Sequence, residues 1–300
     1  MKPDELRSKL GGVISFPVTP FNKDYSLDLD GLRKNLRELL KHPLCAIVPA
    51  AGTGELFSVS PAEQLAIIQV TLEEVNGKVP VLAATGFNYP LGIELAKQAE
   101  HAGVDGILAF PPYYPNADVS GLFDYYEAIA KATSLGMIIY SRDWANYSPS
   151  DVEKFSKIKT LIAYKDGQGN IRRYQMIKTR LGDRLHWIGG AGDDCVPGYY
   201  SIGVRTYTSS IANVAPKLSL KLHELAAEGH SAELDRLMNE MVVPMYELRA
   251  RRKGYEVSAM KKMMDQIGLV GGVSRPPLPE VTPAEEREIE SWLPKWKTWL

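Results

Sequence analysis

Eight short runs of apolar residues recur along the chain, and most are continuously apolar rather than alternating with polar residues. Strands with this character are usually covered by helices on both faces, as in a parallel sheet. The runs occupy residues 13–16, 45–49, 79–85, 106–110, 137–141, 161–166, 185–190 and 205–210. This pattern predicts eight parallel strands.

Amphipathic stretches long enough for two to four helical turns separate many of these runs. Examples are residues 29–41, 61–75, 91–101, 122–133 and 151–158. The capping-box sequence Ser60-Pro61-Ala62-Glu63 predicts that one of these helices begins at Pro61. Eight strand–helix units within about 225 residues favour a closed (β/α)8 barrel over a doubly wound open sheet. The predicted fold class is therefore an α/β barrel with additional C-terminal helices.

The strand pattern ends near Pro216, and helical patterns continue toward the C-terminus. They cover residues 218–229, 232–252, 257–268 and 284–293, with a proline-rich segment at 275–283. No linker composition separates this tail from the rest of the chain. We therefore predict a catalytic barrel domain over residues 1–225 and a helical extension over residues 226–300 that packs on the barrel.

Charge and cysteine content exclude several classes of partner. Thirty-five Lys and Arg residues balance thirty-six Asp and Glu residues, leaving a net charge of −1 and no basic block. Nucleic acid and anionic membranes are therefore not expected partners. Cys45 and Cys195 are the only cysteines, which argues against a disulfide framework or a thiolate metal site. We expect a cytoplasmic protein without a secretory signal or a transmembrane segment.

Active sites of such barrels lie at the carboxyl ends of the strands, which singles out Lys165 and Tyr140. Lys165 closes the apolar run 161–166. In a desolvated pocket its pKa would fall, and the neutral amine could form a Schiff base with a carbonyl group. Tyr140 ends the preceding run, where its phenol could shuttle protons. The alternatives are a solvated lysine at a strand end and a tyrosine that only packs.

The loops after other strands offer binding groups. Gly52-Thr53-Gly54 could hold a carboxylate through backbone N–H groups, or could be a plain turn. The aromatic loop 110–115 could reach a site or pack against a neighbouring subunit. Neither a metal-ligand spacing nor a nucleotide fingerprint is present, so we expect no metal and no cofactor.

Several of these motifs together resemble the dihydrodipicolinate synthase/N-acetylneuraminate lyase family. The resemblance covers roughly residues 10–216. The motifs that match in order and spacing are Pro17-Val18-Thr19-Pro20-Phe21, Gly52-Thr53-Gly54-Glu55, Pro112-Tyr113-Tyr114, Tyr140, Lys165 and Gly192-Asp193-Asp194.

The resemblance implies roles for particular residues. Lys165 would form the Schiff base with a 2-oxo acid, and Tyr140 would relay protons. The Gly52-Thr53-Gly54 turn would hold the carboxylate next to the keto carbon. Tyr114 would reach across a dimer interface into the site of the neighbouring subunit, and Thr208 and Ser209 would line the pocket. The family also implies a homotetramer built as a dimer of dimers.

Two departures from the family pattern indicate a rebuilt substrate end of the pocket. Many members have two hydroxyl residues where this chain has Gly52-Thr53, and an Asn and a Pro where it has Ser141-Arg142-Asp143. With the opening segment 10–21 and the helical tail, these features resemble the family members that dehydrate and decarboxylate a sugar diacid. Arg142 is then the candidate for the far carboxylate, because its planar guanidinium matches that group. The alternatives are retro-aldol cleavage of a related sugar acid and a catalytically silent barrel that binds one.

Overall fold

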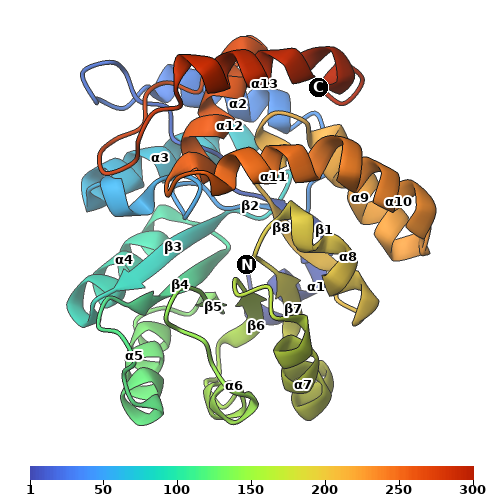
Figure 1. Cartoon of the computed structure of the whole chain (residues 1–300). Coiled ribbons are helices and arrows are strands. Elements are labelled where there is room, and N and C mark those ends of the chain that lie inside the picture. Colours follow the sequence, from blue (N-terminus) through green and yellow to red (C-terminus); the bar gives the residue numbers. More distant parts are fainter. The chain divides into compact units, whose positions relative to one another are not determined.

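The computed structural model describes all 300 residues, and its eight strands form one parallel sheet (Figure 1). The strands are β1 (Gly12–Ser15), β2 (Ala46–Ile47), β3 (Leu82–Phe87), β4 (Gly106–Pro112), β5 (Gly136–Ser141), β6 (Leu161–Asp166), β7 (His186–Gly189) and β8 (Thr206–Ser209). Their order in the sheet is β2-β1-β8-β7-β6-β5-β4-β3, so that β2 and β3, which are consecutive in the chain, are the two ends. This is the strand order of a (β/α)8 barrel. The predicted fold class is confirmed.

Helices follow the strands and then continue as a C-terminal series. They are α1 (Pro3–Lys9), α2 (Leu29–Leu39), α3 (Pro61–Val75), α4 (Tyr89–Ala102), α5 (Val119–Lys131), α6 (Pro149–Phe155), α7 (Ile171–Leu181), α8 (Val196–Ser201), α9 (Pro216–Glu228), α10 (Ser231–Leu237), α11 (Val243–Ala250), α12 (Tyr255–Gln266) and α13 (Pro283–Trp296). None of them combines the length and the apolar character that crossing a bilayer demands.

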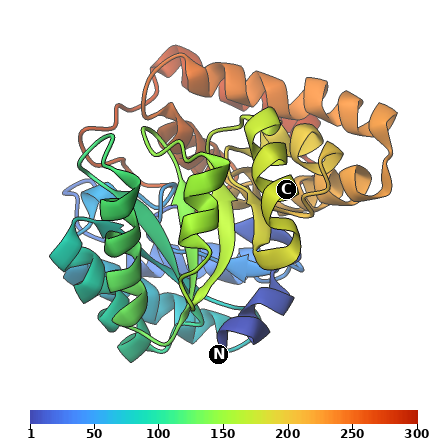
Figure 2. The ribbon, with the colours of Figure 1, turned by 90° about the horizontal axis from the view of Figure 1, so that it is seen from below.

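The contacts within the chain divide it into two compact units. The first unit comprises Met1–Gly12 and Pro80–Thr208. In it α4, α5, α6 and α7 surround strands β3 to β7 (Figure 1), and Figure 2 shows these teal to olive helices on the outer side of the strands. The strands are buried almost throughout, which explains their continuous apolar character.

The second unit comprises Val13–Val79 and Ser209–Leu300. It joins strands β1 and β2 and helices α2 and α3 to the C-terminal helices. The side-chain amide of Asn35 on α2 donates to the Val270 carbonyl at 2.7 Å and accepts from the Val270 N–H at 2.9 Å. The chain after α12 is therefore tied to α2 by its backbone. The predicted division into residues 1–225 and 226–300 stays a prediction.

Two helix boundaries show how local sequence sets the elements. Ser60 caps α3, since its hydroxyl accepts from the Glu63 N–H and the Glu63 carboxylate accepts from the Ser60 N–H. The predicted start at Pro61 is confirmed. The single helical stretch predicted over 232–252 is instead α10 and α11 joined by a π-helical turn, Met238–Val242. Pro244 follows that turn and has no N–H to donate, so a regular helical hydrogen-bond ladder cannot pass through it.

Candidate functional site

Lys165 and Tyr140 lie on neighbouring strands of the first unit. Tyr140 of β5 is paired in register with Lys165 of β6, so both side chains leave the sheet on the same face. The Lys165 Nζ atom lies 3.2 Å from the centroid of the Tyr140 ring. Only 3% of Lys165 is exposed, so the amine is withdrawn from water. The two residues singled out by their strand-end positions are therefore brought together.

The carbonyl of Gly190, directly after β7, connects the two side chains. It accepts a hydrogen bond from Lys165 Nζ at 3.1 Å, and the Tyr140 hydroxyl donates to it at 3.5 Å. The approach requires glycine, because a Cβ atom at position 190 would lie 2.5 Å from Lys165 Cγ and 2.7 Å from Nζ. Gly190 was not predicted as a site residue, although it is the last residue of the predicted strand 185–190.

Burial and charge set the protonation of the pair. Burial, followed by the positive charge of Arg142, holds the pKa of Lys165 well below its usual range, while Asp166 acts in the opposite direction. This favours the neutral amine, which is the nucleophilic form of lysine. Burial raises the pKa of Tyr140, so its phenol keeps its proton at neutral pH. The arrangement offers a nucleophile beside a proton donor.

Asp166 follows Lys165 in sequence, but its carboxylate contacts helix α8 and the loop after β6. Its carboxylate accepts from the Tyr199 hydroxyl on α8 at 2.8 Å and from the Gly169 N–H at 3.0 Å. Burial raises the pKa of Asp166, and the hydrogen bond from Tyr199 counteracts this. Asp166 and Tyr199 anchor the end of β6 and were not predicted. The position of Asp166 directly after the candidate lysine is the sequence signal that could have singled it out.

Arg142 lies two residues beyond Tyr140, just after β5. Its guanidinium is 5.6 Å from the ring centroids of both Tyr140 and Phe110, and its Nε atom donates to the Asp143 carboxylate at 2.7 Å. The side chain is 30% exposed. Arg142, the positively charged side chain predicted to bind the substrate, therefore lies near the candidate catalytic pair and remains in contact with solvent.

The Gly52-Thr53-Gly54 turn belongs to the second unit. A Cβ atom on Gly54 would lie 2.8 Å from the Ala50 nitrogen, so the close backbone packing there requires glycine. Thr19 of the opening motif contacts this turn, because its hydroxyl donates to the Gly54 carbonyl at 2.7 Å. The N–H groups of Thr53 and Gly54 donate to no group within the protein. The turn thus has the donors that a carboxylate needs.

The remaining predicted residues have different surroundings. Thr208 is buried near the end of β8. The Ser209 hydroxyl contacts the Ser219 hydroxyl at 2.8 Å and accepts from the Ala212 N–H at 2.9 Å. Tyr114 is 73% exposed in the loop after β4. Their predicted substrate and interface roles stay predictions.

Eight parallel strands in barrel order, with a desolvated lysine in β6, define a lysine-bearing (β/α)8 barrel. The sequence profile of the dihydrodipicolinate synthetase family matches residues 9–295. The chain therefore belongs to the dihydrodipicolinate synthetase family and is an enzyme of this lyase family. The resemblance found from the motifs is confirmed, and it extends into the C-terminal helices.

Individual relatives agree with this membership. A probable 5-dehydro-4-deoxyglucarate dehydratase from Bradyrhizobium sp. (strain ORS 278) is 37% identical over 293 residues, covering 96% of this chain and 93% of the relative. The crystal structure of dihydrodipicolinate synthase from Oceanobacillus iheyensis matches with a TM-score of 0.93 at 28% identity, covering 99% of this chain and 100% of the other. N-acetylneuraminate lyase from Fusobacterium nucleatum shares the fold, with a TM-score of 0.86 at 22% identity over 97% of this chain and 99% of that chain.

Proposed function

We propose that the protein is a Schiff-base-forming lyase that dehydrates and decarboxylates 5-dehydro-4-deoxy-D-glucarate to 2,5-dioxopentanoate. The observation that carries the proposal is the buried Lys165 amine, with its lowered pKa, facing Tyr140. The substrate is proposed from relatives of 36–37% identity that are named probable 5-dehydro-4-deoxyglucarate dehydratases.

The first step uses the neutral amine of Lys165. Nζ adds to the keto carbon of the substrate, the carbonyl oxygen leaves as water, and a cationic imine forms. The imine acidifies the neighbouring methylene group, whose proton is lost to give an enamine. The protonated phenol of Tyr140 relays protons in these steps, which its raised pKa supports.

The second half of the reaction removes two small molecules. The enamine expels the neighbouring hydroxyl group, which takes up a proton and leaves as water. The resulting conjugated imine accepts the electron pair released when the far carboxylate departs as carbon dioxide, which gives a dienamine with an enol at the former carboxylate-bearing carbon. The dienamine takes up a proton at carbon to restore the imine, and the enol tautomerises to the aldehyde. Hydrolysis of the imine then regenerates the Lys165 amine and releases 2,5-dioxopentanoate. The imine accepts the electron pairs released by deprotonation and decarboxylation, and the enamine supplies the pair that expels the hydroxyl group, so the proposal needs no cofactor.

Two groups are proposed to hold the ends of the diacid. The free N–H groups of the Gly52-Thr53-Gly54 turn are suited to the carboxylate next to the keto carbon. Arg142 is suited to the far carboxylate, because a guanidinium can donate two parallel hydrogen bonds to it. Thr208 and Ser209 are proposed as pocket residues of the same site.

We further propose a cytoplasmic homotetramer, assembled as a dimer of dimers. The exposed Tyr114 supports this assembly, since a large aromatic side chain in contact with water is typical of an interface. The membership in the dihydrodipicolinate synthetase family supports the proposed role as a metabolic lyase that acts on a sugar diacid.

A product assay tests the reaction. Incubation with 5-dehydro-4-deoxyglucarate should release carbon dioxide and 2,5-dioxopentanoate in equal amounts. Retro-aldol cleavage would instead give pyruvate and a second three-carbon product without carbon dioxide. Neither product, under conditions in which the substrate binds, would favour a catalytically silent sugar-acid-binding protein.

A further inference from the structure

The carboxylate of Glu55 is buried directly behind the Gly52-Thr53-Gly54 turn. Glu55 has no exposed surface, and its backbone has a φ of 57°, in the left-handed region that favours glycine. One carboxylate oxygen forms an ion pair with Lys261 Nζ, and the other accepts from the Arg275 N–H at 3.0 Å. Two residues of the C-terminal segment therefore hold this carboxylate.

Lys261 is as deeply buried as its partner. It lies on α12, 1% of it is exposed, and Nζ also donates to the Val273 carbonyl at 2.8 Å. The same amine lies 4.6 Å from the centroid of the Phe21 ring, in the motif that follows β1. Burial raises the pKa of Glu55 and lowers that of Lys261, and their mutual attraction opposes both shifts.

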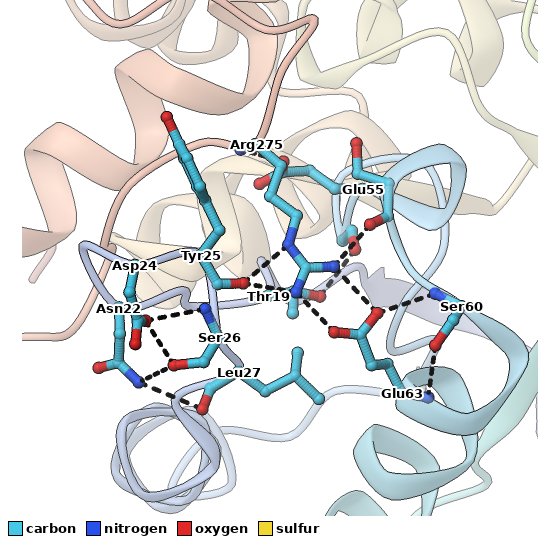
Figure 3. Close-up of polar contacts among 12 residues, drawn as sticks. Thr19, Asn22, Asp24, Tyr25, Ser26, Leu27, Glu55, Ser60, Glu63 and Arg275 are labelled. Atoms are coloured by element: carbon cyan, nitrogen blue, oxygen red, sulfur yellow. Dashed lines mark hydrogen bonds and ion pairs between the residues drawn. The ribbon is translucent and has the colours of Figure 1, made fainter.

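Arg275 holds the chain that follows the turn. Its guanidinium donates to the Glu63 carboxylate at 2.5 Å and to the Tyr25 carbonyl at 3.0 Å (Figure 3). It also donates to the Ser58 carbonyl at 2.6 Å. Figure 3 also shows Glu63 bound at the same time to the backbone of Ser60, the cap of α3. Both the turn and the helix start after it are thus tied to the C-terminal segment.

A buried ion pair usually adds little net stability compared with a well-packed apolar pair, because desolvation offsets the attraction. A buried pair can instead impose one geometry on the backbone that carries it. Here the backbone is that of Glu55, whose N–H donates to the Gly52 carbonyl at 3.2 Å and closes the turn. The orientation of the Thr53 and Gly54 N–H groups depends on this turn.

We propose that Lys261 is a positioning residue for substrate binding: through Glu55 it fixes the Gly52-Thr53-Gly54 turn in the geometry that receives the carboxylate next to the keto carbon. The inference rests on the proposed function, in which this turn binds that carboxylate. Lys261 itself does not touch the substrate. The inference extends the substrate site to α12, in the C-terminal helices.

The test measures pyruvate binding, because pyruvate carries the keto carbon and its neighbouring carboxylate but no far end. Borohydride reduction traps the imine on Lys165, and the pyruvate concentration for half-maximal trapping reports binding. Two variants are compared with the wild type: Lys261→Met, and the double variant Glu55→Gln/Lys261→Met, which leaves no unpaired buried charge. Lys262→Met is the matched control, since it removes an ion pair to Glu286 at 3.0 Å from the same helix.

We expect both Lys261 variants to raise the half-maximal pyruvate concentration about tenfold, because small displacements of binding groups have large effects on productive geometry. Trapping at saturating pyruvate should stay near the wild-type level, and Lys262→Met should change neither quantity. The double variant should regain much of the melting temperature lost by Lys261→Met without regaining pyruvate binding.

A purely structural role predicts a different result. It would lower the fraction of active protein, and hence the maximal trapping, but would leave the half-maximal concentration unchanged. That result in both Lys261 variants would overturn the inference while leaving the proposed function intact. Absence of any adduct on the wild-type protein would instead refute the proposed function, and the inference with it.

Discussion

The amine of Lys165 contacts two groups at the end of β6 and is withdrawn from water. It donates to the Gly190 carbonyl, faces the ring of Tyr140, and loses nearly all contact with water. Arg142 adds a second positive charge nearby, which further disfavours protonation of the amine. One cation can thereby serve two purposes, since it keeps the lysine neutral and remains able to bind a carboxylate.

Removal of the Arg142 side chain tests whether Arg142 binds the far carboxylate of the substrate. Arg142→Ala should raise the KM for the diacid about 10- to 100-fold, because a hydrogen bond to a charged group contributes about 1.5–3 kcal/mol. At a pH high enough that Lys165 is neutral in both proteins, trapping by pyruvate, which lacks the far carboxylate, should keep its wild-type concentration dependence. Steady-state kinetics with the diacid supply the measurement. An unchanged KM would exclude Arg142 as the group that binds the far end.

The pH dependence of imine formation follows from the lowered pKa of Lys165. Only the neutral amine reacts, so the trapping rate should rise with pH and level off well below the usual lysine pKa. Because Arg142 lowers this pKa, Arg142→Ala should move the rise to higher pH.

The charged form of Lys165 is disfavoured by folding, so this lysine costs stability as pH falls below its usual pKa. Lys165→Met should accordingly raise the free energy of unfolding at pH 7, by about 1 kcal/mol. A melting temperature below that of the wild type would contradict this.

At the scale of elements, the site depends on register and on close backbone approach. Pairing of Tyr140 with Lys165 sets the two side chains side by side, and the segment after β7 brings the Gly190 carbonyl to both. The strand termini fix these positions more rigidly than loops would.

Gly190→Ala tests the contact between β7 and β6. The added methyl group would overlap Lys165 Cγ and Nζ, so the side chain must leave its position. We expect kcat to fall about 100-fold, the scale of loss that misplacement of a reacting group by about 1 Å produces. Gly11→Ala is the control, because no atom lies within 4 Å of the added methyl group. Wild-type kcat in a folded Gly190→Ala variant would show that this carbonyl does not position the lysine.

The strands and the lysine could be predicted because their signals are local. Continuous apolar runs located all eight strands, and a lysine closing one of them stood out. The short helix α8 carries no periodic pattern, and its Tyr199 binds Asp166 from 33 residues away. Glu55, Lys261 and Arg275 come together only through the tertiary fold, over separations of more than 200 residues. No spacing rule in the sequence could reveal that cluster. The burial of Glu55 and Lys261, which makes each charge need a partner of opposite sign, is visible only in the structure.

At the scale of the whole molecule, Tyr114 lies at an interface between subunits in the proposed homotetramer. It is 73% exposed, and the neighbouring Tyr113 is 87% exposed. The exposure of these two side chains supports the proposed interface, because tyrosine is enriched at protein–protein interfaces. The proposed assembly would bury one of these side chains in the site of a neighbouring subunit.

Subunit mixing tests this arrangement. Lys165→Met and Tyr114→Ala should each be nearly inactive alone. If Tyr114 acts across the interface, mixing the two under subunit exchange should restore activity. An even mixture should reach about one quarter of the wild-type rate, since half of the dimers are hybrids and each hybrid holds one intact site. If the mixture stays inactive although subunit exchange is demonstrated, Tyr114 acts within its own subunit or only in packing.

The central claim is that Lys165 forms a covalent imine with a 2-oxo acid. The most direct test is to incubate the protein with 5-dehydro-4-deoxyglucarate, reduce with borohydride, and locate the modified peptide by mass spectrometry. The account predicts one adduct per chain, on Lys165, that is absent in Lys165→Met. An adduct on a different lysine, or no adduct with either this substrate or pyruvate, would contradict it.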